Sequence, residues 1–512
     1  MRELLHAAKP STSGVGQKVT AGVDLTGPRA MPPDPVRPTL GPMARHQRLR
    51  LAVLTYAVVV LTPLFVVLIG PVDRDRGFWI EFGVALGFIG LAMLGLQSVL
   101  TARFGGFSAS LGQDALLQFH RQAGIVAFVL VLAHPVVLLA ANSSYWAYLD
   151  LRDNFLRAAF LIIVLVALPV IIITSLWRDR LRIPYEWWRL GHGALAVLIV
   201  LIGLVHITRV RHYLESGWKQ ALWIGIGAAA IGCVLYVRVV TPLRQRRDPY
   251  VVTSVEPLAD RTWSITLEPE EGQPTSFAAG QFHFVTFDRT PFSIEQHPFS
   301  VASTAAEPNQ IEFAVKELGD FTSTIGEVPV GSRAFVQGPH GSLQLPDDGA
   351  RGVVLVAGGI GITPVLSILR TLRDRRDERP VVLVYANRTI GEAAYRDELR
   401  RLADGLDLTV VEVIDDPPPD WNGERGPINR SMLERVLPPD PARWHHVICG
   451  PSPMMELVER TIEELGVPLD RIESERFDIG AAGAIGRRAT SIRRTVLGLG
   501  VLMVAAAALF AI

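Results

Sequence analysis

Two stretches of the chain share one pattern, HRQAGIVAFVLVLAH at residues 120–134 and HGALAVLIVLIGLVH at residues 192–206. Each is an apolar run with a histidine at both ends, and the two histidines of a stretch stand 14 residues apart. Fourteen helical steps of about 100° fall roughly 40° short of four turns, so both histidines lie on one helix face, about 21 Å apart along the axis. The pattern predicts two helices that face each other with paired histidines at two depths.

Paired histidines of this kind predict two stacked bis-histidine b haems, with His120 opposite His192 and His134 opposite His206. A single histidine is more often a satisfied core residue than a ligand. In a lipid bilayer, however, an ionisable side chain is costly and usually functional, and equal spacing on two helices favours a common role. We therefore interpret the four histidines as metal ligands.

Apolar runs of spanning length surround the two histidine stretches. The chain has 512 residues and is 49% hydrophobic, which indicates a membrane protein of several domains. A shorter run near the end predicts a seventh span, although an interfacial anchor is the alternative. The runs lie at about 51–70, 78–100, 115–141, 154–177, 187–208 and 218–240, with the seventh at 496–512.

Charge sets the expected orientation. Arginine clusters precede the first span, separate the fourth from the fifth and follow the sixth, so they fall on one side of the membrane if the helices alternate. The positive-inside rule makes that side the cytoplasm and predicts a multi-pass protein of the plasma membrane. The 50 basic and 50 acidic residues give no sign of a nucleic-acid partner. Cys233 and Cys449, the two cysteines, cannot form a four-cysteine iron–sulfur or zinc site.

After the sixth span the sequence changes to short alternating strands and then to alternating strands and helices, which predicts a β-barrel followed by an α/β nucleotide-binding domain. The first residues are rich in Pro, Gly, Ser and Thr and are expected to be disordered and cytoplasmic. The expected division is an extension at 1–45, a six-helix haem domain at 46–245, an FAD-binding barrel at 246–348, an NAD(P)-binding domain at 349–480 and a C-terminal helix at 487–512.

Four motifs occur in the soluble half: HPFS at 297–300, KELGDFT at 316–322, VVLVAGGIGITP at 353–364 and CGP at 449–451. A glycine-rich turn between a buried strand and a helix lets backbone approach a pyrophosphate, whose charge the helix N-terminus stabilises. Arg388 stands where an NAD enzyme would carry an acid, and its guanidinium can meet a 2′-phosphate. We therefore favour NADPH over NADH, with a solvated arginine as the alternative.

With the histidine pairs, these motifs resemble the superfamily of NADPH oxidases and transmembrane ferric reductases, from about residue 50 to 480. The resemblance implies that Cys449 lies beside the nicotinamide and that Phe477 covers the flavin, although here 35 residues follow Phe477. The implied FAD-binding residues are His297, Pro298, Phe299, Ser300, Gly319 and Thr322. The implied nucleotide-binding residues are Gly358, Gly359, Gly361, Thr363, Pro364, Arg388, Cys449, Gly450 and Pro451.

The expected function is transfer of electrons from cytosolic NAD(P)H through FAD and two haems to an extracytoplasmic acceptor, either oxygen or ferric iron, because a flavin must convert a hydride into single electrons. Arg209, Arg211 and Lys219, with His212, are expected to form a positive mouth at the outer site. The alternatives are a membrane-anchored NADPH-dependent flavin or ferredoxin reductase with a cytosolic acceptor, and a haem-binding sensor or transporter.

Overall fold

The computed structural model describes residues 45–70, 76–104, 112–271, 275–306, 310–345, 349–476 and 487–512. The expected N-terminal extension falls outside this part, apart from residue 45. Seven described helices are long and apolar enough to cross a membrane, as the hydrophobic runs predict. They are α1 (Arg45–Val66), α2 (Phe78–Thr101), α4 (Gln113–Ala141), α5 (Phe155–Leu176), α6 (Tyr185–Val210), α7 (Gly217–Leu235) and α13 (Arg487–Ala511).

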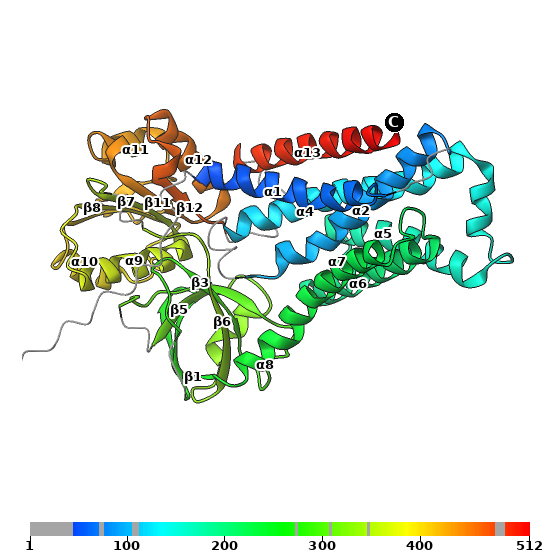
Figure 1. The fold of residues 1–512 in the computed structure, drawn as a ribbon. Coiled ribbons are helices and arrows are strands. Elements are labelled where there is room, and N and C mark those ends of the chain that lie inside the picture. Colours follow the sequence, from blue (N-terminus) through cyan, green and yellow to red (C-terminus); the bar gives the residue numbers. More distant parts are fainter. Residues whose placement is uncertain are drawn as a thin grey trace, which may run out of the picture. The chain divides into compact units, whose positions relative to one another are not determined.

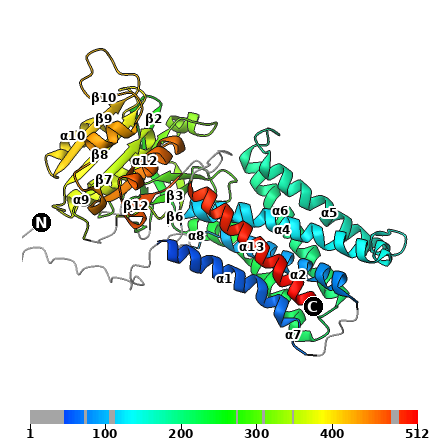
Figure 2. The same ribbon diagram turned by 90° about the horizontal axis from the view of Figure 1, so that it is seen from above.

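Helix α2 is central among the seven and contacts α1, α4, α6, α7 and α13 (Figures 1 and 2). Glycines on α2 allow α4 to pack closely, because a Cβ at Gly90 would lie 2.5 Å from a methyl group of Val131. At Gly87 an added Cβ would lie 2.8 Å from Nδ1 of His134. Close packing of α2 against α4 therefore depends on the absence of side chains at these positions.

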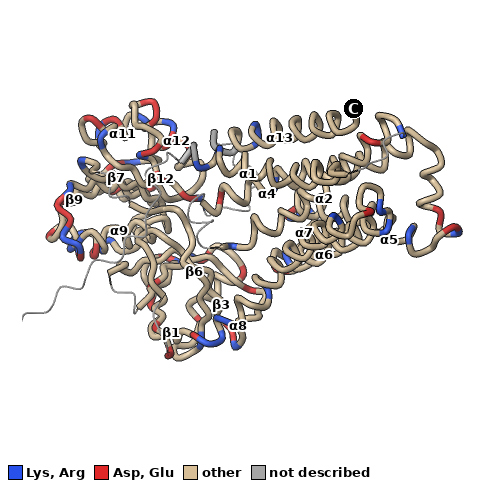
Figure 3. The backbone as a smooth tube through the Cα atoms, in the orientation of Figure 1, with Lys and Arg blue, Asp and Glu red and all other residues tan. Residues whose placement is uncertain are grey.

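Charged residues are concentrated in the soluble half and near the helix ends, and most of each long helix carries none (Figure 3). Beyond α7, a short π-helical turn (Tyr236–Val240) and α8 (Thr241–Gln245) continue to the first strand. The chain thus passes from α7 through these two short segments directly into the soluble half.

The first soluble domain is one six-stranded antiparallel sheet in the order β4-β3-β6-β1-β2-β5. A bridge between Val301 and Phe313 joins the two edge strands, so the sheet closes on itself. The core of the domain consists of inward-facing residues such as Ile265, Val285 and Phe313, none of which is exposed. The strands are β1 (Tyr250–Ala259), β2 (Thr262–Pro269), β3 (Phe282–Thr286), β4 (His297–Ser300), β5 (Ile311–Lys316) and β6 (Arg333–His340).

The second soluble domain is a parallel sheet in the order β10-β9-β8-β7-β11-β12, with helices α9 (Ile362–Asp374), α10 (Arg396–Ala403), α11 (Arg430–Val436) and α12 (Ser452–Glu464). The direction of the strand order reverses between β7 and β11, and ligands bind at such a switch point, beyond the carboxyl ends of the strands. The strands are β7 (Val353–Gly358), β8 (Val381–Asn387), β9 (Leu408–Ile414), β10 (Glu424–Arg425), β11 (His445–Cys449) and β12 (Ile472–Ser474).

Candidate electron-transfer site

The four membrane histidines meet in two pairs. The ring centres of His120 and His192, which we call the inner pair, are 6.1 Å apart. Those of His134 and His206, the outer pair, are 6.3 Å apart. The inner pair lies at the ends of α4 and α6 that are nearer to the first soluble domain, since Arg189, three residues before His192, bonds to that domain. Helices α4 and α6 thus present opposed imidazoles at two depths.

Hydrogen bonds fix the tautomer of one histidine in each pair. Nδ1 of His134 lies 2.8 Å from the carbonyl oxygen of Gly83, which can only accept, so this nitrogen carries the proton. Nδ1 of His192 lies 3.1 Å from Oγ of Ser175, whose own proton goes to the carbonyl of Ile171. In both histidines the Nε2 lone pair is then available to a metal, the arrangement typical of ligating histidines.

The separation of the rings suits a single metal ion between them. Two metal–imidazole bonds of about 2 Å each, with the distances from the nitrogens to the ring centres, give roughly 6 Å between centres. Among the described residues, no group of three or more His, Cys, Asp or Glu side chains comes together as a metal site. Two protein ligands leave the remaining positions to a group such as a porphyrin, so the residues present fit haem iron.

A cavity of about 410 Å³ adjoins the outer pair. Its wall is largely apolar and comes from α2, α4, α5 and α6, with tyrosines from the turn Ser143–Leu149. The polar residues on the wall are His134, His206, Arg76, His212, Tyr145 and Tyr148. A flat apolar group with a polar edge would match this lining.

Arg76 is a member of the outer site that sequence reasoning missed. Its Nε donates to Glu81 over 3.1 Å, and Glu81, which is 2% exposed, also accepts a short hydrogen bond from the hydroxyl of Tyr213. Nη2 of Arg76 is buried and has no hydrogen-bond partner in the described part of the chain. A buried donor of this kind usually has a partner, so the cavity is suited to an anionic group.

The prediction of a positive mouth formed by Arg209, Arg211 and Lys219 names the wrong residues. Lys219 is 4% exposed, and its ammonium donates to the carbonyl of Val67 over 2.7 Å, so it closes the end of α1. Arg209 and Arg211 are exposed and do not line the cavity, whereas His212 does. The cation that the cavity wall contains is Arg76.

Arginines at helix ends near the inner pair bond to the first soluble domain. Arg103, just beyond α2, donates from Nη1 to Gln296 at 2.8 Å and Gln337 at 3.1 Å, and its guanidinium lies 3.5 Å from the ring centre of Phe284. Burial, with Arg189 nearby, lowers the pKa of Arg103 to about 9. The cation therefore lies in a site where a neighbouring anion would be stabilising.

His297 lies beside the N-terminal turn of α6. Its ring stacks on Phe321, with centres 4.1 Å apart and planes 11° apart. Burial lowers the pKa of His297, and the nearby Glu186 partly opposes this effect. Nε2 of His297 is buried without a hydrogen-bond partner among the described residues. Pro298, Phe299 and Ser300 follow it on β4, the edge strand of the sheet.

Gly319 and Thr322 do not form the start of an α-helix. Thr322 begins a short 3₁₀ helix (Thr322–Glu327), and its hydroxyl accepts hydrogen bonds from the amides of Leu318 and Gly319, both at 2.9 Å. The amide of Gly319, an implied FAD-binding residue, is thus bonded within the turn in this structure. Side-chain capping by threonine competes with the anion for the same donors.

The nucleotide motifs meet at the switch point of the parallel sheet. A Cβ at Gly361 would lie 2.3 Å from the carbonyl oxygen of Cys449, and one at Gly450 would lie 3.0 Å from the amide nitrogen of Gly358. Gly359 has a φ of 54°, which suits glycine. Pro451 and Met454 approach Gly358 from the other side of the turn. The two backbone segments can approach this closely only because these residues lack side chains.

Other predicted nucleotide residues lie around that turn. Thr363 and Pro364 are buried on α9, and the hydroxyl of Thr363 donates to the carbonyl of Ile360 over 2.8 Å. Burial, and to a lesser degree Glu475, raises the pKa of the Cys449 thiol, which favours the neutral thiol over the thiolate. Arg388 is exposed directly after β8. Phe477 lies outside the described residues.

Three family models match the chain. They are a ferric reductase like transmembrane component at residues 86–203, an FAD-binding domain at 249–349 and an oxidoreductase NAD-binding domain at 355–460. This order is the architecture of the NADPH oxidase and transmembrane ferric reductase superfamily, so the resemblance drawn from the motifs is confirmed. The chain is a multi-pass membrane protein with FAD-binding and nicotinamide nucleotide-binding domains.

Curated relatives match the soluble half. The reductase component of propane 2-monooxygenase from Rhodococcus jostii is 31% identical over 44% of this chain and 62% of its own length. NADH-cytochrome b5 reductase 1 from Aspergillus terreus is 29% identical over 40% of this chain and 72% of its own. A solved ferredoxin reductase of carbazole 1,9a-dioxygenase is 26% identical, with a TM-score of 0.40, over 45% of this chain and 69% of its own. The chain thus spans less than two thirds of the first of these relatives.

Proposed function

We propose that the chain transfers electrons from NAD(P)H, through FAD and two b haems, to an acceptor on the opposite side of the membrane. The histidine pairs are the observation on which the proposal rests. Each pair places two imidazoles about 6 Å apart, and hydrogen bonds to Nδ1 leave Nε2 of His134 and His192 free to bind iron. Bound haem supplies a centre that accepts and returns one electron at a time.

The order of the sites gives the direction of transfer. Arg103 and Arg189 hold the FAD-binding domain against the helix ends that contain the inner pair. The outer pair lies 14 residues further along α4 and α6, which is about 21 Å of helix rise. Arginine clusters at the FAD-side helix ends favour a cytoplasmic location for the soluble half and an extracytoplasmic outer cavity.

Both axial positions of each haem would be filled by histidine, so the acceptor would receive its electron at the haem edge. Arg76 places a cation on the wall of the outer cavity, which favours an anionic group there. That group is a haem propionate or an acceptor such as an anionic ferric chelate, and oxygen is the neutral alternative.

The experiment is anaerobic addition of NADPH to the purified protein. A low-spin b-type spectrum with about two haems per chain, reduced by NADPH only when FAD is bound, is the expected result. Superoxide detection and the colour of a ferrous chelate then identify the acceptor. A protein without haem, or with haem that NADPH cannot reduce, would refute the proposal.

A second candidate is a membrane-anchored reductase with a cytosolic acceptor. The similarity of the soluble half to the reductase component of propane 2-monooxygenase favours it, since that relative is named for a reductase function. In this case the purified protein would reduce soluble acceptors at the same rate after mutation of His134 and His206.

We also propose that Arg388 selects NADPH. Its exposed guanidinium, at the carboxyl end of β8, can form a charge-assisted contact with a 2′-phosphate, worth on the order of 1.5–3 kcal/mol. Arg388→Ala should therefore raise KM for NADPH by about tenfold or more and leave KM for NADH nearly unchanged. An unchanged ratio of the two KM values would mean that Arg388 is merely a solvated arginine. NADH, which the name of the cytochrome b5 reductase relative includes, is the alternative nucleotide.

A further inference from the structure

Helix α13 has one buried face from Ile492 to Phe510. Its buried residues recur every three or four positions, which places them on a single stripe. The opposite face is exposed, with Leu497, Val501 and Leu509 between 57% and 71% accessible. The stripe consists of Ile492, Val496, Leu499, Met503, Ala507 and Phe510.

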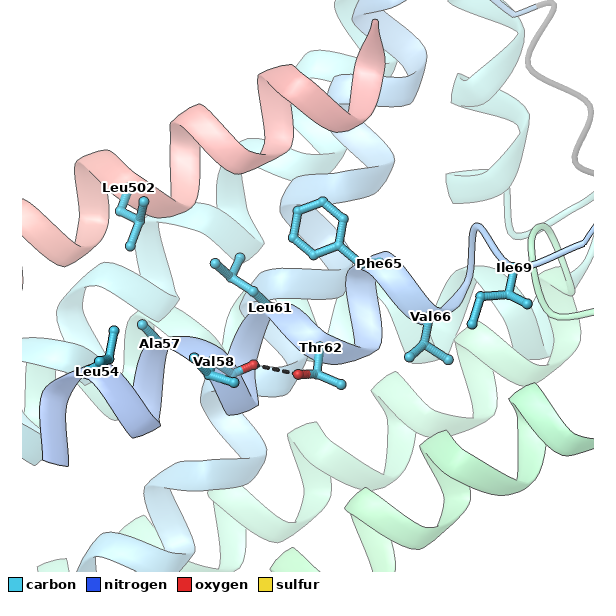
Figure 4. A pocket seen from close by; sticks show the side chains of 9 residues that line it. All are labelled: Leu54, Ala57, Val58, Leu61, Thr62, Phe65, Val66, Ile69 and Leu502. Carbon is cyan, nitrogen blue, oxygen red and sulfur yellow. Dashed lines mark hydrogen bonds between the residues drawn. The ribbon is translucent and has the colours of Figure 1, made fainter. Parts of the chain in front are cut away.

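This stripe packs into the helix bundle. Helix α13 contacts α2, α4 and α1, and its stripe shares one hydrophobic core with residues such as Ile89 and Phe119 (Figures 1 and 2). The groove between α1 and α13 opens outward and is apolar (Figure 4). The hydroxyl of Thr62 in that groove is bonded to the carbonyl of Val58, so the groove presents hydrocarbon, as a lipid-facing surface does. Helix α13 is therefore part of the bundle wall, which favours a seventh span over an interfacial anchor.

The last turn of α13 reaches the residues behind the outer cavity. The ring of Phe510 packs edge-on against that of Tyr213, with centres 5.3 Å apart, and the two side chains are 2% and 5% exposed. The hydroxyl of Tyr213 donates to Glu81, which in turn holds Arg76. Arg76 lines the cavity beside the outer histidines. A continuous series of contacts thus joins the C-terminal helix to the cavity wall.

Tyr213 depends on its neighbours for its position. Its backbone φ is 67°, in the left-handed region that a tyrosine rarely adopts, and Arg211 two residues earlier has a φ of 58°. Such a conformation persists where surrounding contacts hold it. Phe88 and His212 contact the Tyr213 ring from the cavity side, at 6.4 Å and 4.2 Å between ring centres. Phe510 supports the ring from α13.

We propose that α13 is a working part of the outer site: Phe510 holds Tyr213 where its hydroxyl fixes Glu81, and Glu81 in turn orients Arg76 toward the cavity. This inference rests on the proposed function, which assigns a redox centre to the outer pair. Helix α13 would then fix the position of side chains around that centre. Phe510, Tyr213 and Glu81 are positioning residues, and none of them lines the cavity.

The test compares Phe510→Ala with Leu509→Ala in the full-length protein. The two positions are adjacent on α13, but Phe510 is buried against Tyr213 and Leu509 is 68% exposed. The readout is the midpoint potential of each haem by spectroelectrochemical titration, with the inner haem as internal reference. Tyr213→Phe, which keeps the ring and removes the hydroxyl, and the double variant Phe510→Ala with Tyr213→Phe complete a cycle.

Phe510→Ala is expected to lower the outer potential, because a displaced Arg76 no longer stabilises the added electron. A tenfold change in the reduction equilibrium corresponds to about 59 mV for one electron. Tyr213→Phe should act in the same direction, and the double variant should show less than the sum. Leu509→Ala should leave both potentials unchanged, and every variant should keep the inner potential.

The inference is overturned if Phe510→Ala and Leu509→Ala give the same outer potential as the unchanged chain, or if the two substitutions in the cycle are additive. The same cycle on the melting temperature requires no haem and keeps the Phe510–Tyr213 coupling testable in the apoprotein. A chain that contains no haem would refute the proposed function, whereas unaltered potentials in a chain with two haems refute the role of α13 alone. Phe510→Leu replaces Phe510→Ala if the alanine variant fails to fold.

Discussion

The inner and outer histidine pairs have nearly the same ring separation but different surroundings. The inner pair lies near Arg103 and Arg189, which bond to the FAD-binding domain. The ring centre of Trp188 lies 5.2 Å from that of His192. The outer pair opens into a cavity whose wall is mostly apolar, with Arg76 and His212 at its polar edge. The inner pair thus lies near contacts to the soluble half, and the outer pair lines a cavity whose wall contains a cation.

Under the proposed function, this difference predicts a division of labour between two sites that have the same pair of ligands. A site packed against its electron donor needs fixed geometry, which the bonds from Arg103 and Arg189 to the FAD-binding domain supply. A site that serves a diffusing acceptor needs access and a field that retains the acceptor. The comparison therefore predicts that the same substitution has different consequences at the two depths.

The largest expected effect comes from removal of one histidine at each depth. His134→Ala should remove the outer haem and abolish reduction of extracytoplasmic acceptors, while FAD and the inner haem are still reduced by NADPH. His120→Ala should leave FAD reducible and the remaining haem oxidised, since the link to the flavin is lost. Absorbance at the haem and flavin bands after anaerobic NADPH addition measures both. Equal loss of inner-haem reduction in the two variants would contradict the comparison.

Arg103 tests the inner site from the flavin side. Arg103→Ala removes two hydrogen bonds and a cation–π contact to the FAD-binding domain, and a charge-assisted hydrogen bond is worth on the order of 1.5–3 kcal/mol. Electron transfer from FAD to the inner haem should slow by about tenfold or more, with FAD reduction unchanged in stopped-flow records. Arg244→Ala is the control, because Arg244 is exposed and bonds to Tyr236. Equal rates in both variants would mean that Arg103 does not set the docking.

The sequence predicts those features of the sites that arise from a repeated spacing or from a single short motif. Apolar length predicts all seven helices, and the 14-residue spacing predicts which histidines face each other. The glycine turn is predictable because Gly358 and Gly361 must lie close to backbone of the next motif. Each signal arises from local periodicity or backbone sterics.

The remaining residues of the sites depend on contacts between distant segments. Arg76 and Tyr213 meet through Glu81, which is 132 residues from Tyr213 in the chain. Lys219 was misassigned because charge alone does not reveal that its ammonium bonds to the carbonyl of Val67, 152 residues away. Thr322 differs from the implied FAD-binding residue because its hydroxyl bonds to amides of its own turn. Such partners are specified by packing, which no single segment of sequence contains.

Substitution of Gly87 should have a smaller effect, on haem retention at the outer pair alone. A Cβ at this position would lie 2.8 Å from Nδ1 of His134, so Gly87→Ala should displace the imidazole, with a cost of about 1–3 kcal/mol for overpacking. The outer haem should be lost more readily to a haem-binding acceptor protein, and the inner haem should be retained. Gly124→Ala on α4 is the matched control, since no atom lies within 4 Å of its added Cβ. Parallel loss of both haems would show that the packing of α2 against α4 is not specific to the outer site.

Ser175 gives the smallest expected effect and sharpens the comparison most directly. At the inner pair the Nδ1 proton of His192 goes to a side chain, the hydroxyl of Ser175, whereas at the outer pair that of His134 goes to a backbone carbonyl. Ser175→Ala removes the inner acceptor, which lowers the basicity of the imidazole and so stabilises the oxidised iron less. The lost bond is worth about 0.5–1.5 kcal/mol.

The inner potential should therefore rise after Ser175→Ala, by no more than about 59 mV, the equivalent of a tenfold change for one electron. The outer potential should stay constant, because its backbone acceptor is untouched. Thr174→Ala is the control on the same helix, since its hydroxyl bonds only to carbonyls of its own helix, those of Val170 and Ile171. A redox titration that shows equal shifts in the two variants would mean that the hydroxyl of Ser175 does not act through His192, and a shift of the outer potential alone would reverse the assignment of the two pairs.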